Sequence, residues 1–260
     1  MSGATQPLSI TWLGHGTVLL ESSGTRLLTD PLLRPWLGHV RRVAPPAEVP
    51  PEVDAVLISH AHHDHFDFRS LGLVRARQFV VPRGLRGLLE RRGLGPVVEL
   101  DEGGELSVGP VGVRATHAAH GGRRGLLFTP IAALGYLIST PARVYYAGDT
   151  GPFEEMRELA PGLDVALLPI WGWGPRLGPG HLDPRQAAEA LRLLAPRLAI
   201  PVHWGTYSRI GMPRDEASLR EPALRFERFA AELAPDVEVR VLAPGERLEL
   251  PLSAPAGGTP

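Results

Sequence analysis

Short runs of apolar residues recur along the chain, and turns rich in glycine and proline separate them. Apolar runs of this kind, bounded by turn residues, are typical of strands. The pattern predicts strands at residues 8–12, 17–21, 25–29, 54–59, 78–82, 97–100, 105–108, 111–116, 134–139, 143–147, 164–169 and 198–202, with two short strands near the C-terminal end.

Apolar residues at helical spacing occur between some of these strands. Phe68, Leu71 and Val74 indicate a helix, and Asp183 followed by a proline is typical of a helix start. The predicted helices lie at residues 84–92, 152–160 and 184–194 and within 221–233, besides the one at Phe68. Residues 31–52, 121–130 and 170–180 are rich in glycine or proline and are predicted to be loops.

The order of these elements indicates the fold class. Strand-rich stretches followed by strand–helix units occur twice, which suits two packed sheets with helices outside, an α+β architecture. No linker and no tandem repeat divides the chain. We therefore expect one domain over residues 8–252, between an N-terminal tail at residues 1–7 and a disordered tail at residues 253–260.

The composition narrows the chemistry. The 260 residues include no cysteine, and all 27 basic residues are arginine. Thiolate ligands, disulfides and lysine nucleophiles are therefore excluded, and a metal would need nitrogen and oxygen donors. The net charge of −1 does not favour nucleic acid. Without a signal peptide or a stable membrane span, a cytoplasmic protein is expected, which could form homo-oligomers.

Histidine is concentrated in one segment. Four of the ten histidines fall within residues 60–65, where His60, His62, Asp64 and His65 form an H-x-H-x-D-H pattern. Such a pattern arises by chance with a probability on the order of one in a thousand. Imidazole and carboxylate groups are ligands of first-row metals, so the segment predicts a metal site where a strand turns into a helix.

Other polar residues also follow predicted strands. His117 and His120 follow residues 111–116, Asp149 follows residues 143–147, and His203 follows residues 198–202. Ligands at strand ends can converge on one edge of a sheet. Within the cluster, His60 and His62 are two residues apart and face the same way on extended backbone, whereas Asp64 and His65 can point to a second metal.

These segments carry a resemblance to a known family. The H-x-H-x-D-H pattern resembles the signature of the metallo-β-lactamase superfamily, and the later segments resemble its other metal motifs. The likeness covers nearly the whole chain, from Trp12-Leu13-Gly14-His15 through Leu28-Thr29-Asp30-Pro31 to Val202-His203-Trp204-Gly205-Thr206. Gly180-His181-Leu182-Asp183-Pro184 is similar to the subgroup that contains N-acylphosphatidylethanolamine-hydrolysing phospholipase D and ascorbate-6-phosphate lactonase.

The resemblance implies a four-layer αββα sandwich with a site for two metals at one edge. His60, His62 and His120 would hold the first metal and Asp64, His65 and His203 the second, with Asp149 bridging. The family usually reads Pro-Ala-x-His where this chain reads His117-Ala118-Ala119-His120. That alignment favours His120 over His117 as the third histidine ligand.

The expected function is a metal-dependent hydrolase. Two divalent ions, zinc with manganese or iron as alternatives, would share a hydroxide that cleaves an ester bond. A phosphodiester is preferred; the alternatives are a lactonase or carboxylic-ester hydrolase and a non-enzymatic metal-binding scaffold. Asp64 would orient the hydroxide or accept its proton, while His181 would bind a small-molecule or lipid-like substrate and protonate its leaving group. Trp173 would contact the substrate, and His15 and Asp30 either orient ligands or stabilise turns.

Overall fold

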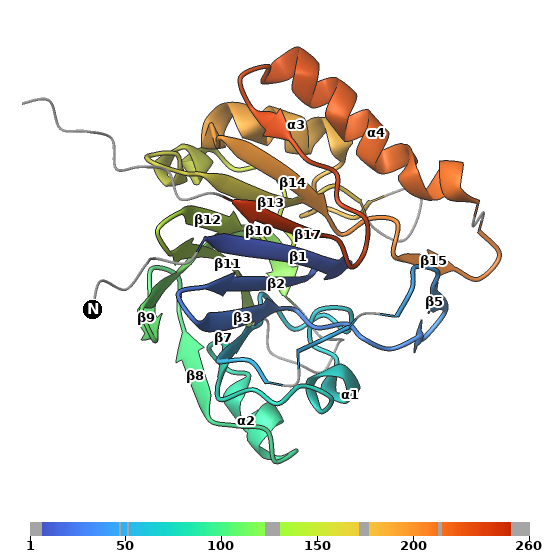
Figure 1. Cartoon of the computed structure of the whole chain (residues 1–260). Coiled ribbons are helices and arrows are strands. Elements are labelled where there is room, and N and C mark those ends of the chain that lie inside the picture. Colours follow the sequence, from blue (N-terminus) through green and yellow to red (C-terminus); the bar gives the residue numbers. More distant parts are fainter. Residues whose placement is uncertain are drawn as a thin grey trace, which may run out of the picture.

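The computed structural model describes residues 7–46, 48–50, 52–122, 131–171, 177–212 and 215–250. Within these ranges the chain forms two seven-stranded sheets and a small three-stranded sheet (Figure 1). The first sheet has the order β17 (Arg247–Leu250), β1 (Leu8–Gly14), β2 (Thr17–Ser22), β3 (Thr25–Thr29), β6 (Ala55–Leu57), β7 (Phe79–Pro82) and β8 (Val97–Leu100).

The second sheet also has seven strands. Its order is β16 (Glu238–Val239), β14 (Leu198–Val202), β13 (Val165–Pro169), β12 (Arg143–Tyr146), β11 (Ile131–Ser139), β10 (Val111–Gly122) and β9 (Glu105–Val108). In each sheet one half is antiparallel and the other half is parallel.

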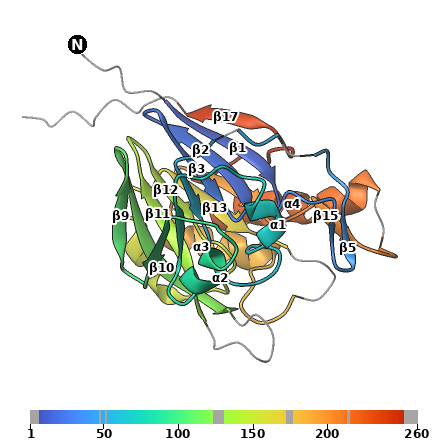
Figure 2. The same cartoon turned by 90° about the horizontal axis from the view of Figure 1, so that it is seen from below.

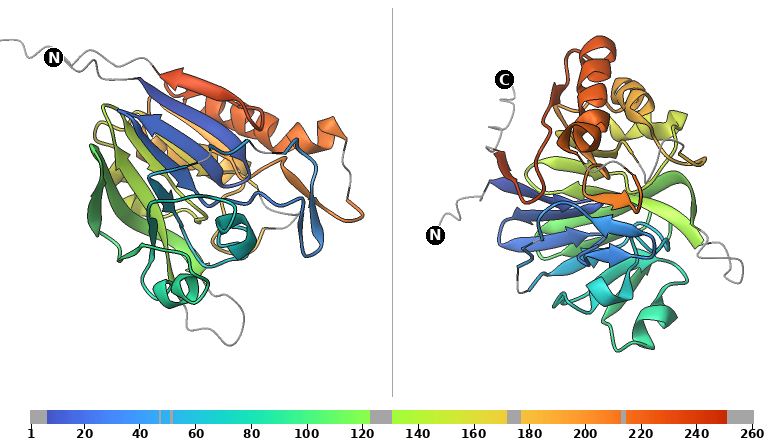
Figure 3. Two further views of the ribbon diagram at one scale, coloured as in Figure 1. Left: turned by 60° about the horizontal axis from the view of Figure 1, so that its bottom comes forward. Right: turned by 90° about the vertical axis from the view of Figure 1, so that its right-hand side faces the viewer.

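Helices cover the outer face of each sheet. α3 (Pro184–Leu194), α4 (Glu216–Leu233) and the 3₁₀ helix η1 (Glu154–Leu159) lie on the second sheet, while α1 (Phe68–Leu71) and α2 (Arg86–Glu90) lie beside the first (Figure 1 and the right-hand view of Figure 3). This order of layers confirms the αββα sandwich expected from the sequence.

Two hydrophobic clusters hold the layers together. The larger contains inward-facing residues of both sheets, such as Leu20 and Val113, and residues of the outer helices, such as Leu191 and Phe226. The smaller lies between the first sheet and α1 and α2, where Val56 and Leu89 are fully buried. Both faces of the central strands are therefore covered, which explains their continuous apolar sequences.

The start of α3 agrees with the sequence prediction. The side chain of Asp183 accepts hydrogen bonds from the backbone nitrogens of Arg185 and Gln186, and the Gln186 side chain accepts one from the Asp183 backbone nitrogen. This reciprocal cap fixes the first turn of the helix. It also fixes the position of the segment that carries His181.

Several predicted elements differ in the structure. Residues 31–52 are not entirely loop, because β4 (Trp36–Leu37) and β5 (Val40–Arg42) form the small sheet with β15 (Tyr207–Arg209). Such short strands have no readable alternation, and β15 comes from a distant part of the chain. The segment 152–160 is a 3₁₀ helix over Glu154–Leu159. α4 begins before residue 221, because its N-cap is Asp215 and Pro222 lies inside it.

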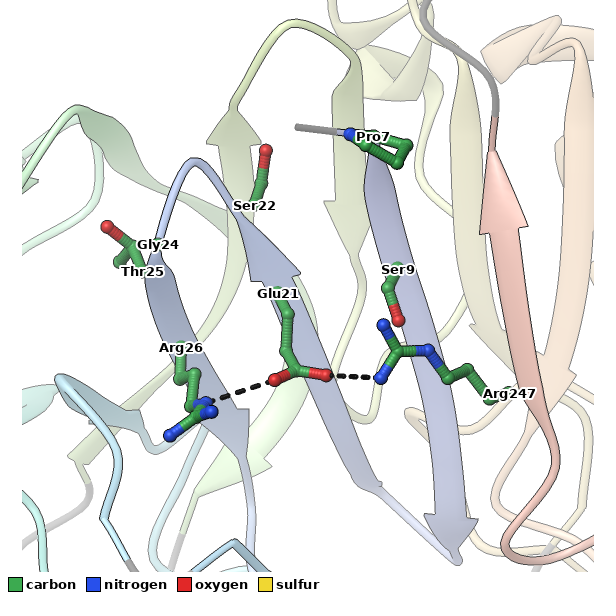
Figure 4. Close-up of a pocket in the computed structure, with 8 residues that line it drawn as sticks. All are labelled: Pro7, Ser9, Glu21, Ser22, Gly24, Thr25, Arg26 and Arg247. Carbon is green, nitrogen blue, oxygen red and sulfur yellow. Dashed lines mark hydrogen bonds and ion pairs between the residues drawn. The ribbon is translucent and has the colours of Figure 1, made fainter. Parts of the chain in front are cut away.

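The small sheet stands at one side of the sandwich (Figure 2). At the opposite end of β1, β2 and β3, a polar surface pocket is lined by Glu21, Arg26 and Arg247, whose charges are joined in ion pairs (Figure 4). No helix in the described ranges is long and apolar enough to cross a membrane.

Candidate metal centre

The polar residues singled out in the sequence meet at one edge of the sandwich. Asp30 follows β3 and His60 lies just beyond β6; these two strands are parallel neighbours. Asp149 lies just beyond β12 and His203 directly follows β14; both strands run parallel to β13. Because parallel strands end at the same edge, these side chains converge as predicted.

The first group of possible ligands consists of His60, His62 and His120. Nδ1 of His62 lies 3.0 Å from Nε2 of His120, and the His60 ring is 4.6 Å from each of the other two rings. Nδ1 of His120 donates to the Gly180 carbonyl oxygen at 2.6 Å, so its Nε2 carries the lone pair. Nitrogens facing one another in this way suit a shared cation.

The second group consists of Asp64, His65 and His203. The Nε2 atoms of His65 and His203 lie 3.1 Å apart, and Oδ2 of Asp64 is 3.6 Å from each. The outer nitrogens are donors, because Nδ1 of His65 bonds the Asp30 carboxylate at 2.7 Å and Nδ1 of His203 bonds the Trp171 carbonyl oxygen at 2.6 Å. The inner nitrogens are again directed at a common point as acceptors.

Asp149 lies between the two groups. Its Oδ2 is 3.2 Å from Nε2 of His65 and 3.9 Å from Nε2 of His60, and its Oδ1 is 3.4 Å from Nε2 of His203. Oδ1 of Asp149 and Nε2 of His60 are buried and have no hydrogen-bond partner among the described residues. Buried polar atoms need a partner, and these fit divalent metal ions. The His/Asp cluster can therefore bind metal.

The electrostatics agree with this role. Burial lowers the pKa of His60 well below its usual value and that of His120 to about 4. Both imidazoles are therefore uncharged at neutral pH and can offer a lone pair to a metal. Burial alone would raise the pKa of Asp64 and Asp149, but the surrounding histidines hold both well below the usual range. Metal ligands must be deprotonated, and these groups are.

His65 differs from the other histidines. Burial would lower its pKa, but the carboxylates of Asp149, Asp64 and Asp30 raise it well above the usual value. Carboxylates crowded around one imidazole create a negative field. The same field would attract a divalent cation to this part of the site.

A bulge in β10 separates His120 from His117. Pairing with β11 shifts between His117, which faces Leu134, and Gly121, which faces Ala132, so three residues oppose one. The bulge changes the direction in which the side chains of the strand point. Both histidines lie within β10, so the prediction that the strand ends at residue 116 is wrong. His120 reaches the cluster, whereas the His117 side chain is 46% exposed and pairs with Glu102.

Asp30 connects the two groups of ligands through hydrogen bonds to their outer nitrogens, directly to His65 and through Ser59 to His60. Its carboxylate accepts hydrogen bonds from Nδ1 of His65, from the backbone nitrogen and Oγ of Ser59, and from the Tyr146 hydroxyl. The Ser59 hydroxyl also lies 2.9 Å from Nδ1 of His60 and accepts from it. The sequence indicated Asp30 but missed Ser59 and Tyr146; a serine next to the motif and a tyrosine in a buried strand were the only available signals.

Three residues of the site have left-handed backbone. His15, Asp30 and His203 have φ values of 54°, 33° and 64°. Non-glycine residues in this region cost about 1–3 kcal/mol each and cluster at functional sites. The glycines nearby relieve crowding, because a Cβ on Gly148 would lie 2.6 Å from Cβ of Ser59.

The remaining predicted residues have different positions. Nε2 of His181 is 3.4 Å from Oδ2 of Asp149, and its side chain is 24% exposed at the edge of the cluster. Nε2 of His15 is 3.1 Å from Oδ2 of Asp64. Trp204 is buried and stacks on Trp12, so it belongs to the core. Trp173, residues 123–130 of one predicted loop and the tails at 1–6 and 253–260 lie outside the described residues.

Comparisons with known proteins agree with this geometry. The Beta-lactamase superfamily domain matches residues 25–204. A metal-dependent hydrolase of Caldivirga maquilingensis is 32% identical over 93% of this chain and 97% of its own length. The N-acyl-phosphatidylethanolamine-hydrolyzing phospholipase D 1 of Caenorhabditis elegans is 32% identical over 77% of this chain and 64% of its own length.

A solved structure extends the comparison to the fold. A metallo hydrolase from the hyperthermophilic archaeon Ignicoccus hospitalis superposes with a TM-score of 0.70 at 25% identity, covering 95% of this chain and 99% of the other. The match over nearly the full length of both chains means that the two proteins share one overall fold.

Proposed function

Since this chain belongs to the metallo-β-lactamase superfamily and is a metal-dependent hydrolase, we propose that it binds two divalent metal ions and hydrolyses a phosphodiester. The observation that carries the proposal is the set of acceptor atoms directed inward. His120, His65 and His203 each use the outer nitrogen as a hydrogen-bond donor, which leaves the inner nitrogen for a metal.

In this proposal each group of ligands holds one ion. His60, His62 and His120 would hold the first, Asp64, His65 and His203 would hold the second, and Asp149 would contribute to both. Zinc suits this mixture of imidazole and carboxylate ligands, with manganese or iron as alternatives. When bound, the ions would supply Lewis-acid activation of water and of the scissile ester.

The protein's own groups would move the protons. Oδ2 of Asp64 is within 3.6 Å of the inner nitrogens of both His65 and His203, so its carboxylate can orient the attacking water and accept its proton. His181 lies across the cluster, where its ring is 4.7 Å from the His120 ring. Its Nδ1 is held by the Gly178 carbonyl oxygen at 3.1 Å, so Nε2 is directed at Asp149 and the site.

A phosphodiester fits this arrangement better than a carboxylic ester. Departure of an alkoxide from phosphorus benefits from a proton donor near the leaving group, and His181 lies beside the first group of ligands, within 3.4 Å of Oδ2 of Asp149. The 32% identity to a phospholipase of this reaction class supports the same choice, and a lipid-like ester is included among the candidate substrates.

The test compares two substrate classes on one preparation. Zinc-loaded protein is assayed with bis-p-nitrophenyl phosphate, with a phospholipid in micelles and with an aliphatic lactone, and chelator-treated protein serves as the control. We expect kcat/KM for a phosphodiester to exceed that for the lactone by at least about tenfold, a difference in transition-state stabilisation of about 1.4 kcal/mol.

The reverse ratio would assign the chain to the lactonases. Metal-loaded protein without turnover on any of the three substrates would favour a metal-binding scaffold. Turnover that survives complete removal of metal would contradict the proposed mechanism.

Replacing His181 with glutamine should lower kcat on the phosphodiester about 100-fold, because loss of a general acid typically costs at least this much. The loss should be larger for an alkyl leaving group than for p-nitrophenol, which departs without help. Metal content should not change, because His181 is assigned to the leaving group. Steady-state kinetics on the two leaving groups and metal analysis measure these effects.

His117→Gln is the matched control. This histidine is exposed and pairs with Glu102, so its replacement should leave kcat, KM and metal content unchanged. Equal losses on both leaving groups in the His181 variant would argue for substrate binding alone. A loss of bound metal would instead make His181 a ligand.

A further inference from the structure

His15 lies in a turn that joins two parts of the candidate site. The turn Gly14-His15-Gly16 connects β1 to β2, and His15 is buried, with 2% of the residue exposed. Its backbone oxygen accepts hydrogen bonds from the backbone nitrogen of His203 and from Nε1 of Trp12, both at 2.9 Å. Its backbone nitrogen lies 2.8 Å from Oγ1 of Thr206 and donates to it. The main chain of His15 is thereby fixed to the segment that carries His203.

The side chain contacts the same group of ligands. Nε2 of His15 is 3.1 Å from Oδ2 of Asp64, and the His15 ring lies 3.7 Å from the His203 ring, centroid to centroid. A carboxylate oxygen can only accept, so Nε2 of His15 carries the hydrogen. This hydrogen bond ties the His15 imidazole to the Asp64 carboxylate.

The flanking glycines allow the turn to pack closely against the site. A Cβ on Gly14 would lie 2.6 Å from Cγ2 of Thr206, and a Cβ on Gly16 would lie 2.9 Å from the Tyr146 hydroxyl and 3.3 Å from the His65 ring. The backbone of the turn is therefore pressed against the site from both sides. The left-handed φ of 54° at His15 is the conformation that this packing imposes.

We propose that His15 is a positioning residue for the second metal. It orients Asp64 through its imidazole and His203 through its main chain, although these two ligands come from segments far apart in the sequence. The inference rests on the proposed pair of metal ions. Outer residues that hold a ligand by a hydrogen bond typically change metal affinity 10–100-fold.

Two substitutions separate the hydrogen bond from the packing. His15→Gln keeps a donor near the position of Nε2, whereas His15→Phe keeps a ring against His203 and removes the donor. Both residues meet the same backbone strain at φ 54°. Titration with cobalt in competition with a chromophoric chelator gives the two metal dissociation constants, and the visible cobalt spectrum reports the ligand geometry of each site.

We expect His15→Phe to weaken the second metal about 10–100-fold and the first metal by less than about threefold. His15→Gln should restore the second constant to within about fivefold of the unsubstituted chain. Tyr207→Phe is the packing control. Its ring lies 5.8 Å from the His15 ring and its hydroxyl donates to the backbone oxygens of Leu32 and Arg34, away from the proposed ligands, so both constants should be unchanged.

Three results would overturn the inference. In the first, the His15→Phe variant keeps both metal dissociation constants unchanged. In the second, it binds both metals more weakly by the same factor. In the third, His15→Gln weakens the second metal as much as His15→Phe does. A fall in the melting temperature of metal-free protein with unchanged constants would mean a purely structural role. If the unsubstituted chain takes up a single equivalent of cobalt, the proposal of two metals fails and this inference fails with it. If the unsubstituted chain takes up two equivalents and only the His15 variants behave otherwise than expected, the inference alone fails.

Discussion

Replacing Asp149 with asparagine should lower the turnover number on the order of 1,000-fold, since loss of a metal's charge stabilisation is worth several kcal/mol. Asp149 reaches both groups of histidines, because its Oδ2 lies 3.9 Å from Nε2 of His60 and 3.2 Å from Nε2 of His65. The amide is nearly isosteric but brings no charge. Both proposed ions would therefore lose their shared anionic ligand.

The measurement pairs kinetics with metal analysis. The variant should hold less than one equivalent of metal after dialysis, whereas the unsubstituted chain should hold two. Asp164→Asn is the control. This carboxylate precedes β13 at the opposite end of the strand and bonds the backbone nitrogen of Arg143, so its loss should leave metal content and turnover unchanged. A variant at Asp149 with full metal content and rapid turnover would contradict the bridging role.

The layered fold could be predicted from the sequence because its causes are local. Apolar runs marked the strands, and Asp183 followed by proline marked the start of α3. The elements that escaped prediction have non-local causes. β4 and β5 consist of two and three residues and exist because β15 pairs with them from a distant segment.

The site divides in the same way. The motif at His60 and the strand-end positions of Asp149 and His203 followed from sequence pattern, because parallel strands bring their ends together. The choice between His117 and His120 needed a bulge that no periodicity displays. The role of Tyr146, whose hydroxyl meets Asp30 across the sandwich at 2.6 Å, depends on how the two sheets pack.

The hydrogen bonds of Asp30 lead to the second large effect. Asp30→Ala should lower the free energy of unfolding by about 3–5 kcal/mol, because it leaves buried donors without their charged partner. Nδ1 of His65 and the backbone nitrogen of Ser59 would lose their acceptor, whereas the Tyr146 hydroxyl could still donate to the Gly16 oxygen at 2.9 Å. Urea unfolding in the presence of chelator measures this cost without any contribution from metal.

Metal affinity should fall together with stability in this variant, since Asp30 holds His65 directly and His60 through Ser59. Asp67→Ala separates the two effects. That carboxylate is also buried and caps α1 through Ser70, so its loss should destabilise the fold and leave both metal dissociation constants unchanged. Asp30→Asn should lower stability and metal affinity less than Asp30→Ala does, because asparagine tolerates the left-handed φ of 33° and keeps one acceptor oxygen. An alanine variant at Asp30 with stability within about 1 kcal/mol of the unsubstituted chain would show that the histidines hold their orientation without it.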